Sequence, residues 1–400
     1  MFSIGRQNLK VLTFTTLYPD ATRARHGIFV ETRLRQLQAF AGIESRVVAP
    51  VPWFPSRNAL FGDYATYAGV PYRENRHGLE VCHPRYPLLP KVGMSAAPWM
   101  MALAVAPALK KLLREGYDFD VIDAHYFYPD GVAAALLAKF FHKPLVITAR
   151  GSDLNLISHY VLPRIWMRWA AHRADHLVAV SEELKQVLVA MDVPPEKITV
   201  LRNGVDAALF RPVERDTMRR RLNMQGFVML SVGNLVPAKG HDLVIEAAAL
   251  IPDAQLFIIG QGPCESELRR LIAKLGLETR VQILDNMEQA ALRDYYGAAD
   301  ALVLASKREG WPNVLLESMA CGTPVVATPV GASPFIVSVP EAGVLAHERS
   351  IRALFLAISR LRAHYPDRAA TRAYSERFSW EETSAGQMRI FNRIIQNKAA

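Results

Sequence analysis

The sequence predicts an α/β protein made of two doubly wound domains, each with a parallel sheet covered by helices on both faces. Short β-branched runs alternate with longer helical patterns, and such alternation with near-continuous apolar strands is typical of parallel sheets. The alternation pauses in a polar, strand-poor stretch at 206–226 and then starts again. A chain of 400 residues, half of them hydrophobic, is too long for one ordinary core and suits two.

The first half carries seven strand patterns with helical patterns between most of them. We place the strands at 10–17, 45–51, 79–85, 120–126, 144–150, 176–181 and 198–203. The helical patterns cover 29–40, 97–115, 131–142, 155–173 and 182–190. Ligands of such sheets bind beyond the carboxyl ends of the strands, so we expect a cleft between two facing sheets.

The second half repeats this order and ends in a separate helix. Its strand patterns are 227–233, 254–260, 281–285, 301–306 and 324–329. We therefore expect domains at 1–205 and 206–378, followed by a helical segment at 379–400. Ser379 with Glu382 three residues later forms a capping box. Because this helix has an apolar face, it must pack on another part of the protein.

Charge and cysteine content limit the partners and the compartment. The net charge is +9, from 47 basic against 38 acidic residues, and residues 1–210 hold 24 basic against 18 acidic. This mild excess suits an anionic ligand or an anionic membrane surface and is too diffuse for nucleic acid. Three widely spaced cysteines indicate neither a disulfide framework nor a zinc cluster, and the N-terminus shows no signal-peptide pattern. We expect a cytoplasmic protein.

Two segments raise the question of membrane contact. Residues 92–109 carry no charge, and this uncharged length of 18 residues is at the lower limit for a membrane span. Their two prolines and their place in the α/β order favour a buried or half-buried helix, with a membrane-surface contact as the alternative. The segment 159–173 combines Trp166 and Trp169 with three arginines. It suits either a headgroup boundary or a helix whose tryptophans pack on the sheet.

Polar groups follow two strands of the second half. Lys239 precedes a helix that begins near Gly240, and a lysine beside a helix N-terminus completes an anion site. The alternative is a solvated lysine in a loop. Gly260 and Gly262 follow the next strand, but the third glycine of a dinucleotide fingerprint is absent. We interpret that stretch as a tight turn.

Two glutamates, Glu309 and Glu317, lie eight residues apart around the start of a helix. Pro312 suits a first helical turn, and the N–H groups of Asn313 and Val314 point outward from it. Glu309 can face the same ligand, since Gly310 allows close approach. The best hydrogen-bond acceptor for sugar hydroxyls is a carboxylate. The alternative is that neither glutamate binds a ligand: one stabilises the helix dipole and the other is solvated.

In the first half, His125 ends the fourth strand, and Arg150 and Asp153 follow the fifth. Gly27 precedes a helix near the first strand. All of these residues fall on the edge expected to face the ligand, although a single histidine is more often structural than catalytic.

With these pieces in this order, the chain resembles the retaining glycosyltransferases of family 4, which have the two-domain GT-B fold. The resemblance rests on "EGWPNVLLESMACGTPVVAT" with its acid-x7-acid spacing, on "GNLVPAKGHDLVIEA" and on "LRNGVD". It implies two facing Rossmann-like domains, a first that binds the acceptor and a second that binds the donor. It also implies that the terminal helix crosses back to the first domain.

The resemblance assigns roles residue by residue. Glu309, His125 and Lys239 are the implied catalytic residues: the first two contact the donor sugar, and Lys239 holds the diphosphate. The implied donor-binding residues are Gly27, Asn234, Gly310, Trp311, Asn313, Val314 and Glu317, with 285–288 beside the nucleobase. Asn234 stands where the family often has arginine, and Arg150 stands where it often has histidine. Arg150 and Asp153 are therefore candidates for binding the acceptor or a phosphate.

The implied reaction transfers a hexose with retained configuration, with the leaving diphosphate as the base. The expected partners are a nucleotide sugar, with UDP favoured over GDP, and a glycan or lipid-linked acceptor for polysaccharide or glycolipid synthesis. No metal or other cofactor is required by the sequence, and a peripheral position on the inner face of the membrane is allowed. A sugar-nucleotide epimerase and a non-catalytic binding protein remain alternatives. A nicotinamide dehydrogenase is weaker, because the complete fingerprint is absent.

Overall fold

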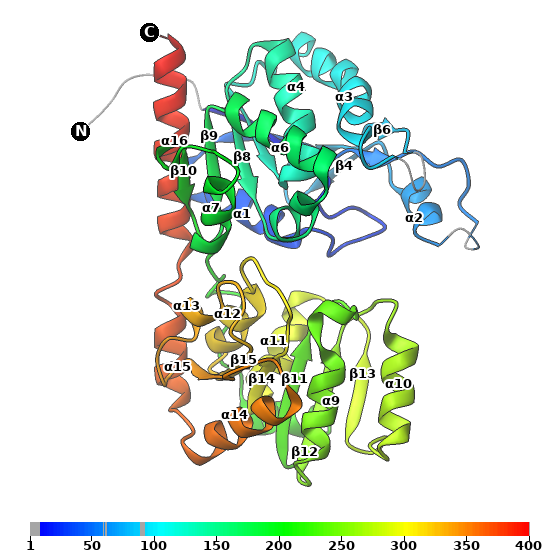
Figure 1. The fold of residues 1–400 in the computed structure, drawn as a ribbon, viewed down its shortest axis with the longest axis vertical. Helices are drawn as coiled ribbons and strands as arrows, with labels where there is room; N and C mark the ends of the chain where they lie inside the picture. The colour runs from blue at the N-terminus through cyan, green and yellow to red at the C-terminus, as the bar shows by residue number, and fades with distance from the viewer. Residues whose placement is uncertain (1–8, 59, 61, 89–92, 400) are drawn as a thin grey trace. The chain divides into compact units, whose positions relative to one another are not determined.

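The chain divides into two compact α/β units (Figure 1) in the computed structural model, which describes residues 9–58, 60, 62–88 and 93–399. The first unit extends to Arg202 and includes the last segment of the chain from Trp380, and the second runs from Asn203 to Ser379. Each unit is built on one extended, largely parallel sheet. The predicted fold class, two doubly wound parallel-sheet domains with a terminal helix that returns to the first, is confirmed.

The sheet of the first unit has eight strands in the order β10-β9-β8-β7-β1-β2-β5-β4. Only the pairing of β4 with β5 is antiparallel among them. The strands are β1 (Lys10–Phe14), β2 (Glu44–Val48), β4 (Arg73–Arg76), β5 (Leu79–Cys82), β7 (Val121–His125), β8 (Leu145–Ala149), β9 (His176–Ala179) and β10 (Ile198–Val200). A short parallel pair, β3 (Val51–Pro52) with β6 (Arg85–Tyr86), lies outside this sheet.

Helices cover both faces of this sheet. On one face, α4 (Val132–Phe141) contacts β7 and β8 and packs against both α3 (Ala97–Arg114) and α6 (Val161–Arg173). On the other, α1 (Ile28–Ala41) packs against the terminal helix α16 (Trp380–Ala399). Phe391 of α16 is fully buried in a core with Val121 and Val146. The apolar face of α16 is therefore part of the first unit. Smaller elements are α2 (Asp63–Gly69), α5 (Ser152–Asn155) and α7 (Glu182–Val189).

The segment at 92–109 forms most of α3. The described part of this segment begins at residue 93, and the helix begins at Ala97. Met101, Val105 and Leu109 are buried, whereas Trp99 and Leu103 are exposed. The helix is thus half-buried, as one of the two interpretations expected. Across the described residues, no helix combines the length and hydropathy that crossing a bilayer requires.

The second unit has six parallel strands in the order β13-β12-β11-β14-β15-β16. They are β11 (Phe227–Val232), β12 (Ala254–Ile259), β13 (Val281–Leu284), β14 (Ala301–Leu304), β15 (Val325–Ala327) and β16 (Gly343–Leu345). The helices are α8 (Arg215–Arg221), α9 (His241–Ala249), α10 (Glu265–Lys274), α11 (Gln289–Ala298), α12 (Asn313–Ala320), α13 (Ser333–Ile336), α14 (Ile351–Ala363) and α15 (Arg368–Ser375).

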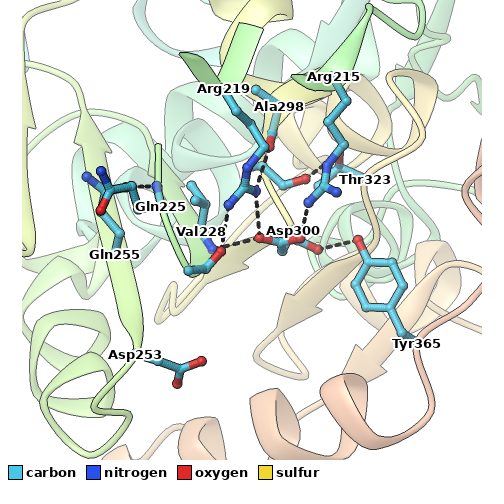
Figure 2. Close-up of polar contacts among 12 residues, drawn as sticks. Arg215, Arg219, Gln225, Val228, Asp253, Gln255, Ala298, Asp300, Thr323 and Tyr365 are labelled. Atoms are coloured by element: carbon cyan, nitrogen blue, oxygen red, sulfur yellow. Dashed lines mark hydrogen bonds and ion pairs between the residues drawn. The ribbon is translucent and has the colours of Figure 1, made fainter. Parts of the chain in front are cut away.

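The stretch at 206–226 is more than a linker, because its helix α8 is bound to the second sheet through Asp300 (Figure 2). Arg215 and Arg219 both form ion pairs with this carboxylate, the latter at 3.0 Å. The same carboxylate accepts the backbone N–H of Val228 at 2.7 Å. Asp300 immediately precedes β14, so this cluster lies at the amino ends of the strands and leaves the carboxyl ends open.

We expect Phe391→Ala to destabilise the first unit by about 3–5 kcal/mol, because truncating a buried phenylalanine leaves a cavity in the core. The exposed Asn392→Ala on the same helix is the matched control. The measurement is hydrogen exchange of the β7 and β8 amides in the full-length chain. Equal protection in the two variants would contradict the packing of α16 on this sheet.

Candidate functional site

The carboxyl ends of the strands bring distant loops of the second unit to one edge. Val232 pairs with Ile259, Ile259 with Leu284, and Leu304 with Ala327. The loops that follow these five strands, β11 to β15, therefore open on the same edge of the sheet. The implied nucleobase loop at 285–288 begins there, where Gln261 Nε2 donates to Asp285 Oδ1 at 3.4 Å.

Lys239 and Glu309, two of the implied catalytic residues, meet at this edge. Lys239 Nζ donates to Glu309 Oε1 at 2.5 Å, and Ser306 Oγ donates to the same oxygen at 2.7 Å. Lys239 ends a short 3-10 turn after β11, whereas Glu309 follows β14. Gly233 lies beside the lysine: a Cβ there would be 3.5 Å from Lys239 Cε. The ammonium and carboxylate from two loops thus form one charged pair.

Two glycines let the backbones around this pair approach closely. Gly240 has a φ of 70°, and a Cβ there would lie 2.3 Å from the Ala305 carbonyl oxygen. Gly331 has a φ of 54°, and a Cβ there would lie 2.1 Å from the Glu309 carbonyl oxygen. Substitution at either position would push the loop away. Gly331 and Ser306 were not identified from the sequence, because nothing in the local pattern shows which loop they meet.

The second glutamate lies on α12, which begins at Asn313 directly after Pro312. Glu317 is partly buried, and its Oε2 accepts from the Tyr296 hydroxyl at 3.0 Å. Asn313 Oδ1 accepts from Asn203 Nδ2 at 3.2 Å, which connects the "LRNGVD" segment to this helix. Tyr296, on a helix distant in sequence, is a contact that the spacing of the two glutamates could not reveal.

The remaining implied donor-binding residues of this unit differ in exposure. Asn234 is exposed, Val314 is partly exposed and Gly310 is buried. Trp311 is also buried, and its indole packs 6.2 Å from the ring centroids of both Phe335 and Phe378. The Trp311 side chain therefore belongs to an aromatic cluster, and only its backbone is suited to a ligand at this edge.

His241 supports the loop that carries Asn234 and Lys239. Its Nδ1 lies 2.9 Å from Ser231 Oγ, and its Nε2 lies 3.3 Å from the Asn234 carbonyl oxygen. Burial lowers the pKa of this ring to about 4. A neutral imidazole here holds the turn without adding a second positive charge next to Lys239.

In the first unit, the residues singled out from the sequence gather at the carboxyl ends of β1, β7 and β8, which are adjacent strands. Gly27 is the N-cap of α1 with a φ of 69°, and a Cβ there would lie 2.2 Å from the Leu17 carbonyl. Close packing between the two loops thus requires glycine at this position.

His125 lies inside a buried polar network. Arg150 donates from a guanidinium nitrogen to His125 Nδ1 at 2.7 Å, so the ring proton is on Nε2, which lies 3.1 Å from Asp123 Oδ2. Gln387 of α16 donates to the same carboxylate oxygen at 2.6 Å and accepts from Arg33 Nε at 2.9 Å. Burial lowers the pKa of His125 to about 4. The ring is neutral, with both nitrogens engaged.

Asp153 has a structural role in this loop. Its carboxylate accepts backbone N–H groups from Phe127 and Gly151, each at 2.7 Å, and from Leu154 at 3.0 Å. These bonds order the turn that follows β8. Arg150, buried beside it, also lies over the Phe29 ring at 5.4 Å from its centroid. As an acceptor or phosphate contact, Arg150 is the better placed of the two candidates.

Within the described ranges, no three His, Cys, Asp or Glu side chains gather closely enough to hold a metal ion.

Comparison with known families identifies both halves of the chain. The family described as Glycosyl transferases group 1 matches residues 214–378, and Glycosyltransferase Family 4 matches residues 27–209. TuaC of Bacillus subtilis, a glycosyltransferase assigned to teichuronic acid biosynthesis, is 31% identical over 360 residues, covering 88% of this chain and 89% of TuaC.

Solved structures share the fold. Sucrose-phosphate synthase from Thermosynechococcus elongatus has a TM-score of 0.77 at 21% identity, covering 98% of this chain and 100% of that one. HepE of Anabaena in complex with UDP has a TM-score of 0.72 at 20% identity, covering 97% and 100%. These likenesses establish the GT-B fold for this chain.

The buried histidine makes a pH dependence testable. Because burial lowers the pKa of folded His125 to about 4 while the unfolded ring titrates near 6.5, the unfolded chain binds a proton that the folded unit excludes. The free energy of unfolding should therefore fall as the pH decreases from about 6.5 to 4, by up to about 3 kcal/mol for this ring. NMR titration of the His125 ring in the full chain checks this, and a midpoint near 6.5 would contradict it.

Proposed function

The chain belongs to the group 1 glycosyltransferases, and on that basis we propose that it transfers a hexose from a nucleoside diphosphate sugar to a hydroxyl group with retained anomeric configuration. The observation that carries this proposal is the meeting of Lys239 and Glu309 at the carboxyl edge of the second sheet, 2.5 Å apart. One group suits a diphosphate and the other suits sugar hydroxyls. HepE, a structural neighbour, is complexed with UDP, which supports a UDP-sugar donor in preference to a GDP-sugar.

In the proposed donor complex, the Lys239–Glu309 pair exchanges partners. Diphosphate oxygens accept from the ammonium, and sugar hydroxyls donate to the carboxylate. Both side chains are partly buried, with 27% and 11% exposure, so each charge has lost hydration and is compensated by the other before the donor arrives. The N-terminus of α12, with Gly310, Asn313 and Val314, adds N–H groups and a positive dipole end. Glu317 accepts from the ribose hydroxyls.

The transfer step breaks the bond between the anomeric carbon and the diphosphate oxygen and forms a bond from that carbon to the acceptor oxygen. The acceptor proton passes to the departing diphosphate. Lys239 stabilises the charge that develops on the leaving group, and Glu309 orients the sugar and stabilises positive charge at its ring. His125, whose two ring nitrogens are engaged by Arg150 and Asp123, takes a positioning role in place of the direct sugar contact that the resemblance implies.

We assign the acceptor to the first unit and propose a glycan or lipid-linked glycan, in polysaccharide or glycolipid synthesis. The relative TuaC, assigned to teichuronic acid biosynthesis, supports this class. Arg150 is the residue suited to an anionic acceptor group. The reaction belongs in a reducing cytoplasm, which suits a chain with three widely spaced cysteines.

The central experiment is a panel of nucleotide sugars tested for donor consumption with and without glycan acceptors. Anomeric protons of the product, followed by NMR, distinguish retention from inversion. An altered nucleotide sugar formed without acceptor would indicate an epimerase, and thermal stabilisation without turnover would indicate a binding protein. Either result would overturn the proposal.

We expect Glu309→Gln to lower kcat by about 10²–10³-fold, the scale of one lost transition-state contact. The substitution keeps the size of the side chain and removes its charge. The exposed Glu278→Gln in the same unit is the matched control and should transfer at the normal rate. Transfer at the wild-type rate by folded Glu309→Gln would exclude a catalytic role for this carboxylate.

Lys239→Ala should weaken the binding of free UDP by about 1.5–3 kcal/mol, the range of a charge-assisted hydrogen bond. Glu309→Gln should leave UDP affinity equal or higher, because the ammonium then has no carboxylate to release. Calorimetry with UDP measures both variants, with the exposed Lys274→Ala as control. If Lys239→Ala bound UDP as tightly as the control, the lysine would not contact the diphosphate.

A further inference from the structure

An exposed apolar surface lies on α3, α6 and the segments that precede them in the first unit. Leu103 is 76% exposed, Val161 is 74% exposed and Ile165 is 53% exposed. We define the α3–α6 surface by its eight exposed large hydrophobic residues, Met94, Trp99, Leu103, Leu156, Tyr160, Val161, Leu162 and Ile165. Exposed apolar side chains concentrated in this way mark an interaction surface.

The two helices meet along this surface through their tryptophans. The Trp99 ring on α3 packs edge-on against Trp166 on α6, with centroids 5.3 Å apart, and Trp166 packs against Trp169 at 6.5 Å. Trp166 and Trp169 are partly buried. They therefore join the helices, and the aliphatic residues of α6 form most of its exposed apolar face.

Among Lys, Arg, Asp and Glu, only the positively charged types occur on the two helices. Neither α3 nor α6 contains an aspartate or glutamate. Their Lys and Arg residues are Lys110, Lys111, Arg114, Arg164, Arg168 and Arg173. Two of them have acidic neighbours in the fold: Arg168 pairs with Asp192 at 2.9 Å, and Lys111 lies 3.8 Å from Glu115. The cations lie mainly in the second half of each helix, after the apolar half.

The apolar first half and the cationic second half of each helix lie at opposite edges of the sheet. The chain passes from α3 into β7 and from α6 into β9, two strands of the same parallel sheet. Both helices therefore run from the carboxyl edge of the sheet towards its amino edge. The apolar halves lie together near the edge that carries His125 and Arg150, and the cationic halves lie beyond them.

We propose that the α3–α6 surface docks on an anionic lipid bilayer. The apolar side chains enter the boundary between headgroups and acyl chains, and the arginines and lysines contact lipid phosphates. A band of aliphatic and aromatic residues bordered by cations, without acids on either helix, matches such a bilayer in both polarity and charge. This docking goes beyond sugar transfer, since it needs neither donor nor acceptor, and it holds the acceptor edge of the first unit near lipid-linked substrates.

The test is co-sedimentation of the full-length protein with vesicles of phosphatidylcholine alone and of phosphatidylcholine with phosphatidylglycerol. We expect binding to the anionic vesicles at low salt and at least tenfold weaker binding to the neutral ones. High salt should reduce the anionic binding, because ions screen the attraction. Absence of binding to anionic vesicles at low salt would overturn the proposal.

Variants locate the contact. Leu103→Ser with Val161→Ser and Ile165→Ser should reduce vesicle binding at least tenfold, and Arg164→Gln with Arg173→Gln should reduce its dependence on salt. The exposed Leu250→Ser with Leu356→Ser, and Arg269→Gln with Arg270→Gln, are matched controls in the second unit. Unchanged hydrogen exchange of the β7 and β8 amides shows that the first unit of each variant is folded. Equal losses in variants and controls, or unchanged vesicle binding by the surface variants, would overturn the assignment of this surface to lipid.

Discussion

Parallel pairing of strands is the constraint on which the rest of this structure depends. A parallel strand can follow its neighbour only after the chain has crossed back over the sheet, so each connection contains a helix or a long loop. Every carboxyl end in the second sheet consequently opens on one edge. Residues as distant in sequence as Gly233, Ser306 and Gly331 become neighbours there without any local signal that they should meet. The charged pair of Lys239 and Glu309 is a product of this arrangement.

That pair also shows how two opposite charges are held at a partly buried edge of the sheet. A half-buried ammonium and a half-buried carboxylate would each lose hydration if they stood alone. Paired at 2.5 Å, with Ser306 as a further donor, each charge is compensated. The edge of the first unit uses a different device: Asp123 connects a neutral histidine to a helix from the opposite end of the chain. One edge therefore carries a paired ammonium and carboxylate, and the other is held by a buried network in which the histidine is neutral and its neighbours are charged.

Much of the fold could be predicted from the sequence because the buried strands are short apolar runs with helical patterns between them. The terminal helix was evident from Ser379 onward because its apolar residues recur with helical spacing. Strand β4 and helix α2 were missed, since they lie in a polar, proline-containing stretch whose pattern resembles a loop. Helix α8 was taken for part of a linker, and only its contacts with Asp300 (Figure 2) reveal why it is ordered.

The residues of the candidate site could be predicted where residue type and spacing in a local motif indicate their role. They could not be predicted where the role depends on a contact between segments distant in sequence. Lys239, Glu309 and Glu317 stand out by residue type and spacing. Tyr296, Ser306 and Gly331 touch them from other loops, and their roles depend on tertiary packing. Trp311 shows the opposite case, a residue inside the motif whose side chain packs among aromatic rings.

The return of α16 to the first unit has a consequence for how the protein is made. A ribosome completes residues 203–379, the entire second unit, before it synthesises the helix that closes the core of the first. The second unit can therefore finish folding during translation, while the core of the first remains incomplete until α16 has been made. Exchange of the second unit between related genes would likewise need two crossovers, one on either side of residues 203–379, to leave the first unit whole.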